Sequence, residues 1–259
     1  MHMNDDATSQ PQEPGDERAA SSSVGTRRVV WLIGAGLLIV AVAGVWWAVE
    51  GQHAAAERKA AEALEKHGVL LVTDPTSGKV RVLKLFDRSM DETVIQNIGQ
   101  MHNVQQMDLT DSGVTDDKLE AISGLTGLVS LALNDNPITD DGLKWLSGLN
   151  NLEHLFLHRT QVTDAGMAHL SDMQSLNILE VPDTGVTDEG LKHLSGLKQL
   201  QHLKLDGNQI TDAGLEALIG MPNLRRLDVA GTQVTATGLE RLRAAMPELA
   251  ASEQSETGE

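Results

Sequence analysis

The sequence predicts a repetitive α/β solenoid of about seven strand–helix units behind a single N-terminal transmembrane helix. A 24-residue internal period begins at Val80 and runs without insertions through a seventh copy. Within each copy the spacing of the apolar residues changes from two residues to a helical spacing, which is typical of a strand followed by a short helix. An uncharged apolar run over residues 29–49 predicts the transmembrane helix.

The composition excludes several classes of function. The formal net charge of −17 argues against a nucleic-acid-binding protein, because phosphate binding needs clustered Lys and Arg. The absence of Cys excludes disulfide scaffolds, thiolate metal sites and cysteine nucleophiles. Aromatic residues make up only 2% of the chain, so a platform for stacking bases is not expected.

The N-terminal part contains two segments of opposite character. Residues 1–28 are polar and rich in Pro, Ser, Asp and Glu, which predicts a disordered cytoplasmic tail. Residues 29–49 read VVWLIGAGLLIVAVAGVWWAV and contain no charge. A helix of this length spans the roughly 30 Å hydrocarbon core of a bilayer. Its ends carry tryptophans, as interfacial positions often do: Trp31, Trp46 and Trp47.

The charges beside this helix predict its orientation. Arg27 and Arg28 precede the apolar run and Glu50 follows it. The positive-inside rule therefore places the N-terminus in the cytoplasm and the repeat domain outside it. A signal peptide cleaved near residues 54–56 is the alternative, but its apolar region would measure only about 7–15 residues. The longer run favours an uncleaved signal anchor.

Three further segments flank the repeats of residues 80–249. Residues 50–67 are rich in Ala, Glu and Lys, which predicts a helical stalk leading away from the membrane. Residues 68–79 contain a turn between two strand-like runs, which predicts a hairpin that caps the first repeat. Residues 250–259 are polar and acidic, and they are expected to form a disordered tail.

The clearest copy of the repeat, LQHLKLDGNQITDAGLEALIGMPN, covers residues 200–223. Leu203 and Leu205 alternate with outward residues, as in a strand with one buried side. Thr211 is expected to cap the following helix by accepting a backbone N–H, and Asp212 suits the positive end of the helix dipole. One such unit cannot bury its apolar face alone, whereas stacked copies can.

The pattern L-x-x-L-x-L-x-x-(N/T)-x-(I/V)-T-D-x-G-L resembles the leucine-rich-repeat superfamily over about residues 68–247. Its T-D-x-G-L half is similar to bacterial envelope-anchored proteins with 24-residue repeats and, more distantly, to the cysteine-containing repeats of F-box-type proteins. The lack of Cys, the lack of an F-box-like segment and the anchor favour the bacterial group. The resemblance implies a binding scaffold, but fold alone names no ligand. It also implies that a polar column bonds the backbone of neighbouring turns: Arg88, Ser112, Asn136, Thr160, Thr184, Asn208 and Thr232.

A partner is expected on the concave face, where outward side chains of adjacent strands line up. The middle repeats place there an aromatic residue among His, Arg and Lys, a composition that favours a binding hot spot. Phe156 is one of only two Phe residues in the chain. The predicted partner-binding residues, here called the central patch, are His154, Phe156, His158, Arg159, Ile178, Glu180, His202 and Lys204. A solvated surface without a partner is the alternative interpretation.

Neither a metal, a cofactor nor a catalytic centre is expected. His154 and His158 would lie roughly 13 Å apart on an extended chain, too far to share one ion. A stacked column of aspartates could suggest calcium, but helix capping and the helix dipole account for each: Asp116, Asp140, Asp164, Asp188 and Asp212. The sequence contains no phosphate-binding glycine loop, nucleophile elbow or H-E-x-x-H motif.

These observations favour a membrane-anchored, non-catalytic protein that binds a protein, or alternatively a glycan, on its concave face. The acidic balance modestly favours a basic partner. Two other functions remain open. One is a structural spacer or assembly component of the cell envelope, and the other is an adaptor in an F-box-like degradation complex.

Overall fold

The computed structural model describes residues 51–85 and 90–252. The chain divides into two compact units, Met1–His53 and Ala54–Glu259, and the repeats all lie in the second. The predicted tail of residues 1–28 and the predicted transmembrane helix of residues 29–49 lie outside the described residues. Within the described ranges, no helix is both long enough and apolar enough to cross a bilayer.

The second unit begins with a helix that runs to residue 66. Ala60 and Leu64, on one side of this helix, are 1% and 0% exposed and belong to the core. Glu57 on the same side is also buried and accepts a hydrogen bond from the amide of Asn103. The helix that was predicted as a stalk leading away from the membrane thus packs against the repeat domain. The helix covers the apolar end of the stack, which has no preceding repeat to bury it.

A hairpin follows the helix. Strands β1 (Leu70–Thr73) and β2 (Val80–Lys84) pair antiparallel, with Leu71 opposite Leu83. The carboxylate of Asp74 accepts hydrogen bonds from the backbone and hydroxyl groups of Thr76 and Ser77, which shape the turn. The hairpin thus joins the helical cap to the repeats.

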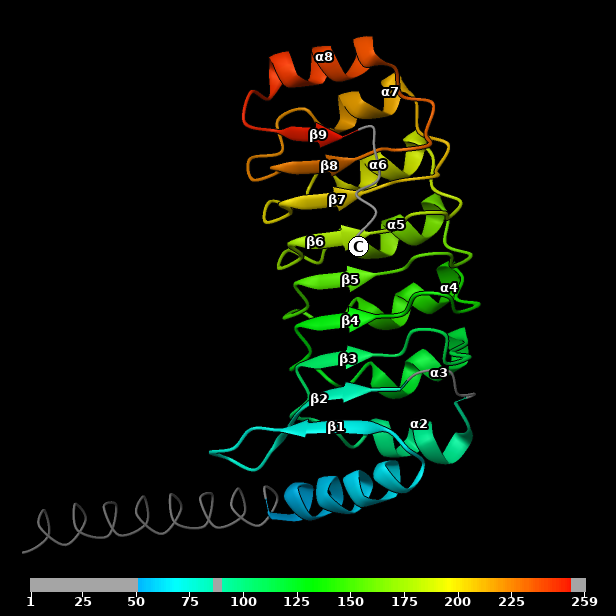
Figure 1. Cartoon of the computed structure of the whole chain (residues 1–259), viewed down its shortest axis with the longest axis vertical. Helices are drawn as coiled ribbons and strands as arrows, with labels where there is room; N and C mark the ends of the chain where they lie inside the picture. Colours follow the sequence, from blue (N-terminus) through cyan, green and yellow to red (C-terminus); the bar gives the residue numbers. More distant parts are fainter. Residues whose placement is uncertain (1–50, 86–89, 253–259) are drawn as a thin grey trace, which may run out of the picture. The chain divides into compact units, whose positions relative to one another are not determined.

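From β2 onward every strand pairs in parallel with the next one along the chain, so the sheet of nine strands runs in sequence order from β1 to β9 (Figure 1). The later strands are β3 (Gln106–Asp108), β4 (Ser130–Ala132), β5 (His154–Phe156), β6 (Ile178–Glu180), β7 (His202–Lys204), β8 (Arg226–Asp228) and β9 (Ala250–Ser252). Between consecutive strands from β3 to β8, the register advances by 24 residues per strand. This arrangement confirms the predicted α/β repeat fold with a parallel sheet.

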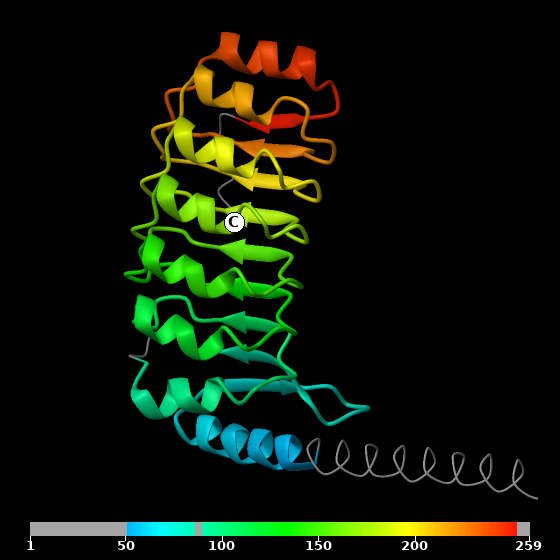
Figure 2. The same ribbon diagram turned by 180° about the vertical axis from the view of Figure 1, so that it is seen from behind.

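The helices that follow the first repeat strand lie on one side of the sheet (Figure 2). They are α2 (Glu92–Ile98), α3 (Asp116–Leu119), α4 (Asp140–Leu143), α5 (Asp164–Leu170), α6 (Asp188–Leu194), α7 (Asp212–Leu215) and α8 (Ala236–Ala245), with 3₁₀ turns at Glu120–Ile122, Lys144–Leu146 and Glu216–Leu218. Between the two layers, columns of leucine fill the core, and Leu155, Leu179 and Leu203 in the strands are fully buried. The opposite side of the sheet is the predicted concave face, and it is called the open face from here on.

A polar ladder runs beside this apolar core, where each strand ends. Asn136 is 2% exposed, and its amide donates to the carbonyls of Leu109 and Leu133 at 2.8 and 3.0 Å. Its side-chain oxygen accepts from the backbone N–H groups of Ser112 and Val114. These bonds satisfy backbone groups of the same repeat and of the preceding one, as the resemblance implied. Arg88, the first member of the predicted column, lies outside the described residues.

The T-D-x-G part of the repeat forms a second link between neighbouring units. The Asp164 carboxylate accepts from the backbone N–H and the hydroxyl of Thr187, both at 2.7 Å. A Cβ added to Gly190 would lie only 2.5 Å from the same carboxylate, so glycine is required there. Four other aspartates accept the same pair of bonds: Asp116, Asp140, Asp188 and Asp212.

The C-terminal end of the stack differs from the prediction. Ala250–Ser252 forms β9, although a disordered tail was expected from residue 250. Ala251 takes the register position that leucine occupies in earlier strands, opposite Leu227. Because alanine stands where the repeat pattern has leucine, the pattern did not predict this last strand. Residues 253–259 lie outside the described residues.

Candidate functional site

The register of the sheet sets two outward columns on the open face. His154 pairs with Ile178, and Ile178 with His202, while Phe156 pairs with Glu180, and Glu180 with Lys204. Each of these six side chains is partly exposed, whereas the leucine between each pair is buried. Strands β5, β6 and β7 thus bring six residues of the central patch together, in the predicted columns.

The other two residues of the central patch lie beyond the strand. His158 and Arg159 follow β5 after the buried Leu157, in the turn that leads toward the helix side. Arg159 has a φ of 49°, in the left-handed region that non-glycine residues rarely adopt. These two residues therefore do not share a strand with His154. The backbone N–H of His158 donates to the Asn134 side chain at 2.9 Å, which holds the turn against the preceding repeat.

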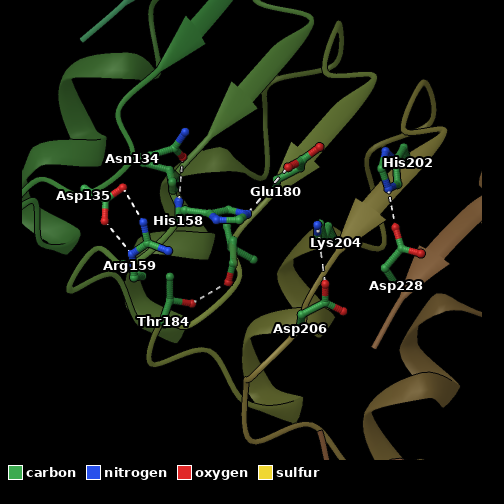
Figure 3. A network of polar contacts seen from close by, with 12 residues as sticks. Asn134, Asp135, His158, Arg159, Glu180, Thr184, His202, Lys204, Asp206 and Asp228 are labelled. Atoms are coloured by element: carbon green, nitrogen blue, oxygen red, sulfur yellow. Dashed lines mark hydrogen bonds and ion pairs between the residues drawn. The ribbon is translucent and has the colours of Figure 1, made fainter. Parts of the chain in front are cut away.

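His158 and Glu180 face each other across adjacent repeats (Figure 3). The His158 Nε2 atom lies 3.7 Å from a Glu180 carboxylate oxygen, beyond hydrogen-bond distance. Burial lowers the pKa of His158 below its ordinary value of 6.5, although Glu180 acts in the opposite direction. Burial thus disfavours the protonated form of the imidazole, the form that would pair with Glu180.

Arg159 is held by a carboxylate of the preceding repeat. Its guanidinium donates to both carboxylate oxygens of Asp135, with Nη2 at 2.7 Å from Oδ2 (Figure 3). This bidentate bond and the charge of Asp135 raise the pKa of Arg159. The cation predicted for partner binding is thus engaged within the chain.

The other basic groups of the central patch have acidic neighbours as well. Lys204 Nζ lies 3.6 Å from Asp206, and His202 Nε2 lies 2.7 Å from Asp228 (Figure 3). Asp228 is only 4% exposed and also accepts from Arg226 at 3.1 Å. These acidic partners, together with Asp135, were missed as site residues, although Asp206 and Asp228 belong to the columns that the period defines.

A second feature of the open face lies at its N-terminal end. Leu70 and Val72 on β1 are 55% and 47% exposed, the highest values among the large apolar side chains of the described residues. The hairpin register places them opposite Lys84 and Val82, two outward residues of β2. The sequence predicted the hairpin but not this exposure, because β1 lies outside the 24-residue period.

The described part of the chain contains no group of three or more His, Cys, Asp or Glu residues placed to hold a metal ion. The aspartate column instead accepts hydrogen bonds from the threonines of the next repeat. These side chains therefore have a structural partner in each repeat.

Comparison with known proteins gives a consistent result. Residues 102–162 and 174–234 match the family model described as leucine rich repeat. The crystal structure of internalin C2 from Listeria monocytogenes is similar at a TM-score of 0.53 and 25% sequence identity, over 67% of this chain and 80% of that chain. No curated protein matches the sequence.

Two other solved structures are similar at lower scores. An internalin from the same species has a TM-score of 0.43 and 19% identity over 68% of this chain and 62% of its own. A leucine-rich-repeat protein from Leptospira interrogans has a TM-score of 0.48 and 21% identity over 66% of this chain and 48% of its own.

Proposed function

Because the repeats of this chain are leucine-rich repeats, we propose that it is a non-catalytic scaffold that binds another protein through the central patch. The observation that carries this proposal is the register of β5, β6 and β7. It places an aromatic and an aliphatic side chain, Phe156 and Ile178, in adjacent columns of the open face. Helices cover the other side of the sheet, so this side is where a partner can reach the strands.

The composition of the central patch supports a protein partner. An aromatic anchor surrounded by polar groups is the usual make-up of an interface hot spot. The ion pairs around it, such as Arg159 with Asp135, hold the polar rim in one conformation before binding. A rim arranged in advance reduces the entropy that is lost when the partner docks.

We further propose that the partner has a basic surface and meets the repeats outside the cytoplasm. The net charge of −17 would attract a basic protein and speed its association. Residues 29–49 would anchor the chain in the membrane. Raising the salt concentration should then slow association, and a protease added to intact cells should digest the repeat domain without permeabilisation.

The binding site is tested by crosslinking the full chain to its partners in the envelope fraction of the cells that express it. The Phe156→Glu variant should lose a partner that the unaltered chain captures. The matched control is Gln106→Glu, which adds the same charge at an exposed open-face position two strands away. Equal capture by all three proteins, each shown to be folded, would mean that the partner binds outside the central patch, whereas capture of no partner would favour a structural spacer.

A further inference from the structure

The charges of the central patch are unevenly balanced. Its two permanent cations are engaged within the chain, because Arg159 binds Asp135 and Lys204 lies beside Asp206. Among the described residues, the Glu180 carboxylate has no hydrogen-bond donor and has only His158 as an ionic neighbour. Lys204 is the register neighbour of Glu180 on β7, but its ammonium pairs with Asp206, so no Lys or Arg of the described residues forms an ion pair with Glu180.

The Glu180 carboxylate is accessible to a partner although its side chain is largely buried. Its side chain is 21% exposed, so a partner can reach the carboxylate while much of the bulk water is excluded. A charge in such a partly buried position interacts more strongly than one on an open surface. Asp183, on the turn after β6, adds a second negative charge, and its field reaches both His158 and Arg159.

Glu180 has two neighbours across the sheet, Lys204 on β7 and Phe156 on β5. Phe156 and Glu180 are directly paired in the register of β5 and β6, so their side chains leave adjacent strands on the same face. Adjacent strands lie about 4.8 Å apart. A cation that docks over this pair can therefore contact the ring and the carboxylate together.

We infer that Phe156 and Glu180 together receive an arginine side chain of the protein partner. Arginine fits better than lysine because its planar guanidinium stacks on an aromatic ring while donating to a carboxylate. It is also the more weakly hydrated cation, so it loses less on entering a half-buried site. This inference rests on the proposed function and specifies what the central patch recognises.

The test uses the full chain labelled with ¹³C at its isoleucine methyl groups. Ile178 lies two residues from Glu180 on the same side of β6 and reports on the site. Ile219, which is 42% exposed and lies after the last 3₁₀ turn, reports on binding elsewhere. The probes are N-acetylarginine amide and N-acetylcitrulline amide, which have nearly the same shape and differ in charge.

The arginine probe should shift the Ile178 methyl signal in a saturable manner, whereas the citrulline probe should not. Glu180→Gln and Phe156→Leu should each weaken the binding roughly threefold to tenfold, the range expected for losing one ion pair or one cation–π contact. The control Glu189→Gln removes the same charge from a helix of the same repeat and should leave the binding unchanged. Glu189 is paired with Lys192 and lies on the helix side.

Equal shifts from both probes, or full binding by Glu180→Gln, would overturn the inference. Such a result would leave the proposed function standing if Phe156→Glu still abolished partner capture. Selective arginine binding without any captured partner would instead support the site and count against the proposed function.

Discussion

The carboxylate of Asp164 accepts two hydrogen bonds from Thr187, the residue that begins the helix of the next repeat. The same Thr187 hydroxyl accepts from the backbone N–H of Glu189 and so caps that helix. Thr187 therefore caps the N-terminus of its own helix and also links that helix to the helix of the preceding repeat. Repeated along the stack, this bond couples each unit to its neighbour and should make unfolding cooperative.

The glycine of the motif should be intolerant of even one methyl group. Gly190→Ala should lower the free energy of unfolding by about 1–3 kcal/mol, because the added Cβ would lie 2.5 Å from the Asp164 carboxylate. Urea denaturation measures the loss. Gly196→Ala, in the same repeat with nothing within 4 Å of the added Cβ, is the control. A similar loss in both variants would point to backbone flexibility instead of the steric contact.

The bond between Asp164 and Thr187 should be measurable as a coupling energy. Asp164→Ala and Thr187→Val should each destabilise the protein by about 1–3 kcal/mol, the usual effect of removing a hydrogen bond to a charged group. The double variant should lose less than the sum of the two. Strict additivity in this cycle would mean that the two residues stabilise the fold independently.

Acid should weaken this link at Asp212. Hydrogen bonds from the backbone and side chain of Thr235 lower the pKa of Asp212 below its ordinary value of 3.8. Below pH 3.8 the unfolded chain takes up a proton at Asp212 that the folded chain still excludes, so stability falls as the pH falls. Asp212→Asn should be less stable than the unaltered chain at pH 7, and this difference in stability should narrow as the pH falls below 3.8. A difference that is constant with pH would show that ionisation is not involved.

His158 should titrate below the ordinary value for histidine. Burial lowers its pKa from 6.5, with Lys204 and Arg159 acting in the same direction and Glu180 and Asp183 opposing them. An NMR titration of the imidazole should therefore have its midpoint below pH 6.5. Glu180→Gln should move the midpoint lower still, because it removes the nearest charge that favours the protonated ring. An upward movement would mean that Glu180 does not face the imidazole in solution.

Truncating two neighbouring residues of β5 to alanine should change the stability of the protein by very different amounts. Leu155 is fully buried, so Leu155→Ala should cost about 2–5 kcal/mol of stability, as other buried leucines do. Phe156 is partly exposed on the open face, and Phe156→Ala should have a small effect on stability. Thermal unfolding compares the two. A large loss at Phe156 would contradict its proposed role as a binding residue.

The columns of the open face could be predicted because the period has no insertions. In a stack with a constant repeat, residues 24 apart become neighbours on adjacent strands, so the columns follow from counting alone. Counting by 24 places Phe156 beside Glu180, and the register of β5 and β6 agrees. The pairing of Arg159 with Asp135 could not be predicted, because it depends on side-chain conformations at two left-handed turn residues.

The sequence by itself therefore determined the repeat, the buried leucines and the order of residues on the open face, since these follow from spacing. Only the tertiary structure decided which charges are already engaged, why the motif needs glycine, and how the ends of the stack are covered. From the sequence, helix capping and the helix dipole were enough to account for Asp164. The structure shows that its carboxylate also accepts hydrogen bonds from Thr187 in the next repeat. Leu64 lies outside the 24-residue period, and Ala251 lies where the period is weak. Each packs against the apolar surface of the terminal repeat next to it, which has no further repeat to cover it.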